Sequence, residues 1–217
     1  MINKTISEMD KRTQEEEQGL FFILNMLLAS FQQRDFSHEK DDLGLIEQIY
    51  HVFDLWLELH LPRKIRTCGS QPNCFSCCYN NPNGITTFDL WVLYLKEFKK
   101  LEERADTIEK QHSDYQELIL ADREEHQIRW LQTTTPCPFL DNGSCSIYQH
   151  RPLACRSHFS VQNPEHCHPQ NVNFLKHQHK QRTLPQQLYQ KLFHSKEHPQ
   201  DLLGACLWIL REQETKS

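Results

Sequence analysis

Eight of the nine cysteines fall in two short blocks of the chain, and their spacing is typical of a metal site. The blocks read CGSQPNCFSCC and CPFLDNGSCSIYQHRPLACRSHFSVQNPEHC, and they hold Cys68, Cys74, Cys77 and Cys78 in the first and Cys137, Cys145, Cys155 and Cys167 in the second. Thiolates are soft ligands that bind zinc, Cu(I) and iron–sulfur clusters. We therefore predict that the fold brings the two blocks together around one thiolate-rich site.

Spacing within the blocks separates the ligand candidates. Cys74 and Cys77 have two residues between them, whereas Cys78 follows directly and points another way, which suits a multi-metal cluster or two sites better than one tetrahedral ion. Prolines on both sides fix the backbone of Cys137, and Gly143 permits a tight turn. The predicted ligands are Cys74, Cys77, Cys78, Cys137, Cys145 and Cys155, and further candidates are Cys68, Cys167 and His158.

The number of cysteines bears on the kind of metal. A structural zinc site takes four ligands, and an iron–sulfur cluster is typically held by four thiolates. Six to eight cysteines exceed one zinc site, and they suit a cluster with spare thiols, a cluster with a zinc, or a binuclear zinc site. We favour an iron–sulfur cluster over zinc.

Composition limits the compartment and the partners. The formal charge of the 217-residue chain is -5, so nothing global favours nucleic acid. The longest apolar run, 20–29, is about half a membrane span, and the polar N-terminus is unlike a secretory signal. We therefore expect a cytoplasmic protein without a membrane segment, in which clustered cysteines bind metal more often than they form disulfides.

The hydrophobic pattern predicts a mostly α-helical fold, a helical domain with two long cysteine-bearing loops organised by the metal site. Thr86 and Asp89 form a capping box for a helix with an apolar face from Phe88 to Phe98, and the charge-dense continuation of that helix, to about Gln132, is expected to be a solvated face with a restart at Ser113. Residues 133–179 are expected to be irregular, and Pro199 to open a closing helix that buries Cys206. Other predicted helices span 14–33, 41–61 and 184–195, and the predicted domains are 1–61, 62–182 and 183–217.

Three strings of the chain, CFSCC, CPFL and CSIYQHRPLACR, resemble the YkgJ-type cysteine-cluster family, known by the motif CxxCxxCC and described as a zinc- or iron-chelating domain. The resemblance covers roughly residues 68–160. This chain departs from the pattern where five residues, not two, separate Cys68 from Cys74, and where Phe75 stands in place of glycine.

The resemblance implies metal binding, and it leaves the activity open. A related domain occurs in flagellin lysine-N-methylases, but this chain has no recognisable methyl-donor motif. On spacing and resemblance, we expect Arg151 and Arg156 to offset the charge of the thiolates and to orient them. The leading hypothesis is a metal-binding protein, with a metal-dependent protein-modifying or redox enzyme and a metal chaperone or sensor as alternatives. The sequence identifies no catalytic residue and no protein partner.

Overall fold

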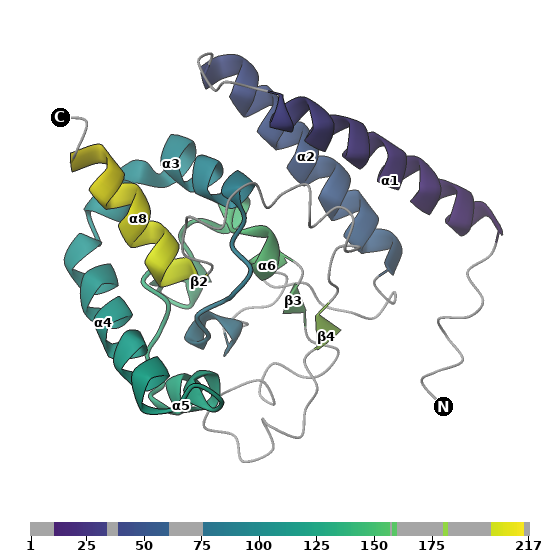
Figure 1. Ribbon diagram of the computed structural model, residues 1–217. Helices are drawn as coiled ribbons and strands as arrows, with labels where there is room; N and C mark the ends of the chain where they lie inside the picture. Colours follow the sequence, from purple (N-terminus) through teal and green to yellow (C-terminus); the bar gives the residue numbers. More distant parts are fainter. Residues whose placement is uncertain are drawn as a thin grey trace, which may run out of the picture. The chain divides into compact units, whose positions relative to one another are not determined.

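The computed structural model describes residues 11–33, 39–60, 76–156, 158–159, 180–181 and 201–214 (Figure 1). The described residues are mostly helical, as the sequence predicts. By internal contacts the chain divides into two compact units, Met1–Arg63 with Leu184–Leu192 and Lys64–Thr183 with Phe193–Ser217. No helix within the described ranges is long and apolar enough to cross a membrane.

The first unit contains a helical hairpin of α1 (Lys11–Gln32) and α2 (Glu39–His60), which pack side by side (Figure 1). Both helices carry apolar side chains at the three- and four-residue spacing that gathers them on one face. That face is buried, and it includes Leu24, Leu28, Phe31, Ile46, Ile49, Phe53 and Trp56. The hairpin is therefore held by apolar burial.

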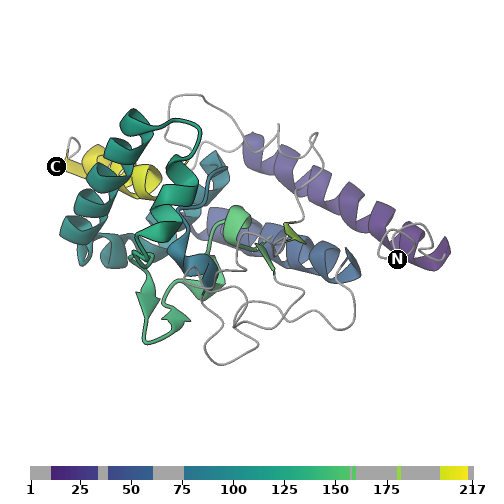
Figure 2. The same ribbon diagram turned by 90° about the horizontal axis from the view of Figure 1, so that it is seen from below.

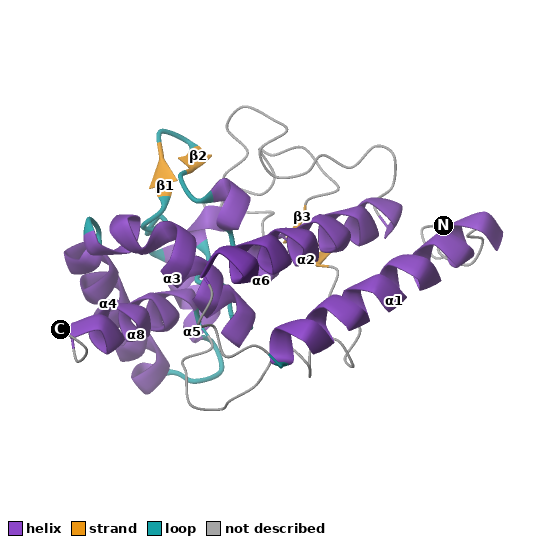
Figure 3. Ribbon diagram, turned by 90° about the horizontal axis from the view of Figure 1, so that it is seen from above, coloured by secondary structure: helices purple, strands orange, loops and turns teal. Residues whose placement is uncertain are grey.

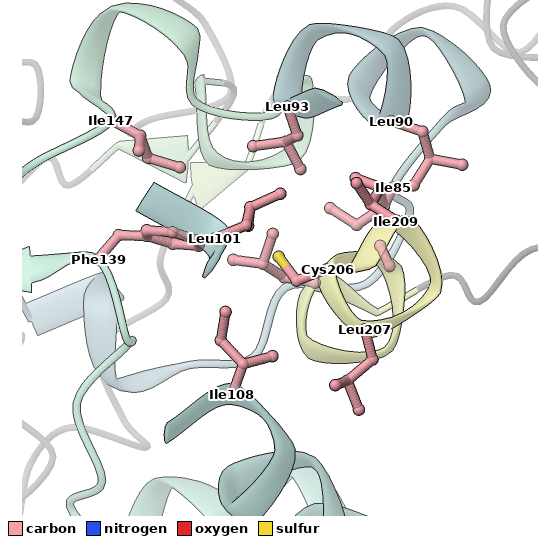
Figure 4. Close-up of a cluster of buried hydrophobic side chains, with 12 residues drawn as sticks. Ile85, Leu90, Leu93, Leu101, Ile108, Phe139, Ile147, Cys206, Leu207 and Ile209 are labelled. Carbon is pink, nitrogen blue, oxygen red and sulfur yellow. The ribbon is translucent and has the colours of Figure 1, made fainter. Parts of the chain in front are cut away.

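The second unit is built on α3, α4 and α8, with the shorter α5 following α4. Helix α8 packs against both α3 and α4, and Figures 1 and 2 show the three lying together. Their bounds are Thr87–Glu102 for α3, Ala105–Ala121 for α4, His126–Gln132 for α5 and Leu202–Glu214 for α8. Side chains of these helices and of the segments between them form a core that includes Ile85, Leu93, Leu101, Ile108, Phe139, Ile147 and Cys206 (Figure 4).

The start of α3 confirms the predicted capping box. The Asp89 backbone N–H donates to the Thr86 hydroxyl at 3.1 Å, and the Asp89 carboxylate accepts from the Thr86 backbone N–H at 2.9 Å. The predicted break at Ser113 is wrong, because α4 runs through it and the helical run is interrupted at 103–104 instead. Ile108 and Tyr115 are both buried, so one apolar face continues along α4 past Ser113.

The first part of the second cysteine block is more ordered than the sequence suggests. Strands β1 (Leu140–Asp141) and β2 (Ser144–Cys145) form an antiparallel hairpin, which Figure 3 shows beyond the helices. Its two-residue turn has positive φ at Asn142 (48°) and Gly143 (76°), the conformation that Asn-Gly favours. A 3₁₀ turn (Tyr148–His150) and the short helix α6 (Leu153–Arg156) follow. The prediction that residues 133–179 are irregular is therefore wrong for this part.

Two further predictions concern the end of the chain. Helix α8 begins at Leu202, so Pro199 does not open it, and Asp201 caps it by accepting from the Gly204 backbone N–H at 2.9 Å. Strands β3 (His158–Phe159) and β4 (Lys180–Gln181) pair antiparallel. The predicted helix 184–195 lies outside the described residues.

Candidate metal centre

A cavity of about 200 Å³ in the second unit is lined by thiols from both cysteine blocks. Cys78 comes from the 3₁₀ helix Ser76–Tyr79, and the second block contributes Cys137, Cys145 and Cys155. The backbones of the blocks also meet, because the Cys137 N–H donates to the Cys78 carbonyl at 2.5 Å. The fold thus brings four of the predicted ligands to one cavity.

The other candidates cannot be placed. The side chains of Cys77 and His158 and the whole of Cys68, Cys74 and Cys167 lie outside what the structure describes. Among the described residues, no group of three or more His, Cys, Asp or Glu side chains has the placement of a metal site. The four thiols are therefore placed around a cavity, and their predicted roles as ligands stay predictions.

Polar side chains of α4 and of its N-terminal boundary hold the backbone on both sides of Cys137. The Arg104 guanidinium donates to the Pro138 carbonyl and, at 2.5 Å, to the Asp141 carboxylate, so one planar fork fixes two points of the loop. Gln111 donates to the Pro136 carbonyl at 3.0 Å. A proline has no backbone N–H, so at Pro136 and Pro138 the carbonyl is the backbone group that can form a hydrogen bond with a helix side chain.

The hairpin that carries Cys145 is fixed in the same way. Ser146 donates to the Phe139 carbonyl through its backbone N–H at 2.8 Å and its hydroxyl at 3.0 Å. Lys100 of α3 donates to the Ser146 carbonyl at 2.7 Å, and it also pairs with the buried Glu97 at 2.7 Å. The other Glu97 oxygen accepts from His150 Nδ1 at 2.6 Å. Helix α3 thereby holds the chain on both sides of the turn after Cys145.

Asp89 joins the helix that carries Cys155 to α3. Its Oδ1 accepts from the Leu153 backbone N–H, the first of α6, at 2.8 Å, while its Oδ2 serves the capping box of α3. One buried carboxylate thus caps two helices, and this satisfies donors that would otherwise be unpaired. Burial outweighs these hydrogen bonds and the nearby Arg156, and it raises the pKa of Asp89 to about 6.

The two arginines occupy different places. Arg151 lines the cavity, and its guanidinium carbon lies 3.9 Å from the centroid of the Tyr148 ring. Arg156 is buried and donates to the carbonyls of Gln149 and Arg151, so it fixes the turn before α6. Of these two arginines, Arg151 lines the cavity, and its charge partly counters the rise in the pKa of the Cys155 thiol.

The four thiols influence each other electrostatically. Burial raises the pKa of the Cys155 thiol, and the neighbouring Cys137, Cys78 and Cys145 raise it further. Burial and the same neighbours, Cys78 and Cys145, also raise the pKa of Cys137. Several thiolates cannot be ionised together in such a place without positive charge to balance them. A metal cation supplies that charge, so the donor set fits a metal.

Cys206 is buried in α8, as predicted, and Figure 4 shows its sulfur directed into the apolar core. The same core packs against Cys137 and Cys145, so Cys206 lies close to the thiol-lined cavity. It does not line the cavity. Burial is the main cause that raises its thiol pKa, and the proximity of Cys137 adds to the shift.

The end of the first block is fixed on α8. Asn81 donates to the Asp201 carboxylate at 2.9 Å and accepts from the Leu203 backbone N–H at 3.2 Å. The Leu202 N–H donates to the Pro82 carbonyl at 3.1 Å. The segment just after Cys78 therefore closes one side of the cavity with support from a helix more than a hundred residues later.

Sequence reasoning missed these anchors. The charged continuation of the helix to Gln132 was expected to be a solvated face, and that is wrong for the buried Gln111. Arg104, at the boundary between α3 and α4, also forms a hydrogen bond with the loop, at Asp141. Glu97 and Gln111 lie near apolar positions of their helices in the sequence, and this spacing was the available sign that they would be buried.

Comparison with known proteins adds the family. Residues 67–173 match the family model CxxCxxCC, described as a putative zinc- or iron-chelating domain. The match covers 107 of the 217 residues, and this part of the chain is similar to the CxxCxxCC family. No curated protein and no solved structure matches the chain. The resemblance seen in the sequence is thus confirmed for residues 67–173, and the description of the family supports metal binding.

Proposed function

We propose that the CxxCxxCC domain of this chain holds an iron–sulfur cluster in the cavity between its two cysteine blocks. Cys78, Cys137, Cys145 and Cys155 would be ligands, together with Cys74 and Cys77 of the first block. The observation that carries the proposal is that one cavity is lined by thiols of both blocks. A cluster bound there supplies one-electron transfer.

The size of the cavity favours a cluster over a single ion. Its volume of about 200 Å³ is several times the ~30 Å³ that one water occupies in the liquid. A lone zinc ion is smaller than that space and takes only four ligands. The four thiols that line the cavity and the two further predicted ligands, Cys74 and Cys77, are together more than a single ion uses, so zinc remains the second candidate only as a binuclear site.

The protein groups around the cavity have distinct proposed roles. The thiols bind the metal, and Arg151 offsets the excess negative charge that several thiolates bring. Asp89, Arg104 and Arg156 hold the backbone that carries the thiols. We propose the cytoplasm as the compartment, because a reducing environment keeps clustered thiols available for a metal.

Anaerobic purification followed by elemental and sulfide analysis tests the proposal. The proposal predicts a coloured protein with stoichiometric iron and acid-labile sulfide, and with an absorption band in the visible range that reduction bleaches. Stoichiometric zinc without sulfide would contradict the cluster and support the binuclear zinc site instead. Protein that contains neither metal after anaerobic purification and reconstitution would contradict metal binding itself.

A further inference from the structure

The thiols form only part of the cavity wall. Among the described residues that line it, Asn80 and Asn83 follow the first cysteine block, and Gln127 comes from α5. These side-chain amides each offer both hydrogen-bond donors and an acceptor. Arg151 is the only charged residue in that described lining. The cavity therefore has two sides. One is the thiol wall, and the other is the amide wall of Asn80, Asn83 and Gln127, with the Arg151 guanidinium beside it.

The amide wall belongs to an ordered part of the unit. Asn83 pairs with Asp201 as an isolated β-bridge, which fixes its backbone against the start of α8. Asn83 and Gln127 both lie next to the hydroxyl of the buried Tyr115. The Tyr115 ring packs edge to face on Trp130 of α5, with centroids 5.2 Å apart. Side chains held in this way are arranged before any ligand arrives, which lowers the cost of binding.

We propose that the amide wall and Arg151 bind a small carboxylate beside the metal; this inference rests on the proposed metal site for the occupant of the thiol wall. A guanidinium binds a carboxylate through two parallel hydrogen bonds, and amide N–H groups donate to the same oxygens. The described lining contains no carboxylate, and Arg151 is the side chain in it that supplies positive charge to an anion beside the thiol wall.

Acetate and acetamide are the probes for this site, because they have nearly the same shape and differ in charge. Each is titrated by calorimetry into the metal-loaded full chain, at constant ionic strength. The proposal predicts that acetate binds at least ten times more tightly than acetamide. Acetate is also expected to move the side-chain amide signal of Gln127 in NMR spectra, and that readout locates the ligand.

Matched variants assign the binding to named groups. Arg151→Gln and Gln127→Ala are each expected to weaken acetate binding about tenfold or more, whereas Arg151→Lys keeps the charge and loses less. Gln132→Ala is the control, because Gln132 is an exposed residue of the same helix α5 that does not line the cavity. It is expected to bind acetate as the wild type does.

The metal content of each sample is measured alongside. If the metal-loaded wild type binds no acetate, or binds acetamide equally well, the carboxylate site is refuted while the metal proposal stands. If Arg151→Gln loses its metal, Gln127→Ala decides the matter, since Gln127 offers no thiol to the metal. Retained metal with unchanged acetate affinity in Gln127→Ala would overturn the inference.

Discussion

The cysteine loop 136–156 and the helical hairpin α1–α2 are stabilised by different means. The hairpin buries an apolar face that includes Leu28, Phe31 and Phe53. The loop buries Phe139 and Ile147 in a core as well, and in addition side chains of α3, of α4 and of Arg104 between them form hydrogen bonds with its backbone and its Asp141 carboxylate. Apolar burial sets how firmly two helices pack, whereas directional hydrogen bonds set where a backbone atom lies.

The difference separates stability from metal binding. Loss of an apolar contact in the hairpin should lower stability and leave the thiols in place. Loss of a polar anchor should also displace a thiol, since a ligand must lie close to its ideal distance from the metal.

Asp89→Ala is expected to have the largest effect, about 4 kcal/mol in the free energy of unfolding, because two helices lose a cap and buried donors are left unpaired. The variant should also bind metal more weakly, since α6 carries Cys155. Urea unfolding and metal titration measure the two effects. Asp114→Ala, at an exposed position of α4, is the control. Unchanged metal affinity in Asp89→Ala would show that this anchor does not position the thiol.

Leu28→Ala in α1 is expected to cost about 3 kcal/mol, because it removes a fully buried side chain from the hairpin. Metal content per folded chain should equal that of the wild type. Hydrogen exchange of α1 and α2 together with elemental analysis checks both expectations. Loss of metal in this variant would break the proposed separation between the two regions.

The dependence of stability on pH isolates the Asp89 carboxyl. Its pKa of about 6 lies above the ordinary 3.8, so the folded state binds the proton more tightly than the unfolded state. Its contribution is therefore fully present below pH 4 and is lost as pH rises towards about 6. Relative to Asp89→Ala, the wild type should lose about 3 kcal/mol over this range. Urea midpoints at several pH values measure this difference, and a constant difference would contradict the raised pKa.

Arg104→Ala is expected to cost about 1.5 kcal/mol, because its hydrogen bonds to Pro138 and Asp141 are partly exposed. Arg104→Lys keeps the charge but not the fork, and it should recover less than half of the loss. Metal affinity should fall in both variants, since Cys137 adjoins Pro138. Arg123→Ala, at an exposed position beyond the other end of α4, serves as the control in the same titrations.

Local signals in the sequence predicted the helices and the cysteine blocks, but they did not predict how the loop is held. The Thr86–Asp89 capping box is a short-range pattern, and it is present as predicted. That Asp89 also caps α6, 64 residues later, depends on the tertiary fold. Arg104 and Gln111 look like members of a solvated helix face until the loop is packed on them. The Asn-Gly turn before Cys145 was the one available signal for the hairpin.

We propose the thiol-lined cavity as the metal centre, and the metal content of two matched cysteine variants distinguishes this cavity from any other site. Cys155 lines the cavity, whereas Cys206 lies in the adjacent apolar core and does not. After anaerobic purification, Cys206→Ala is predicted to keep the wild-type amount of metal, and Cys155→Ala to lose most of it. Retention of metal by Cys155→Ala together with its loss from Cys206→Ala would contradict the claim and place the ligands elsewhere.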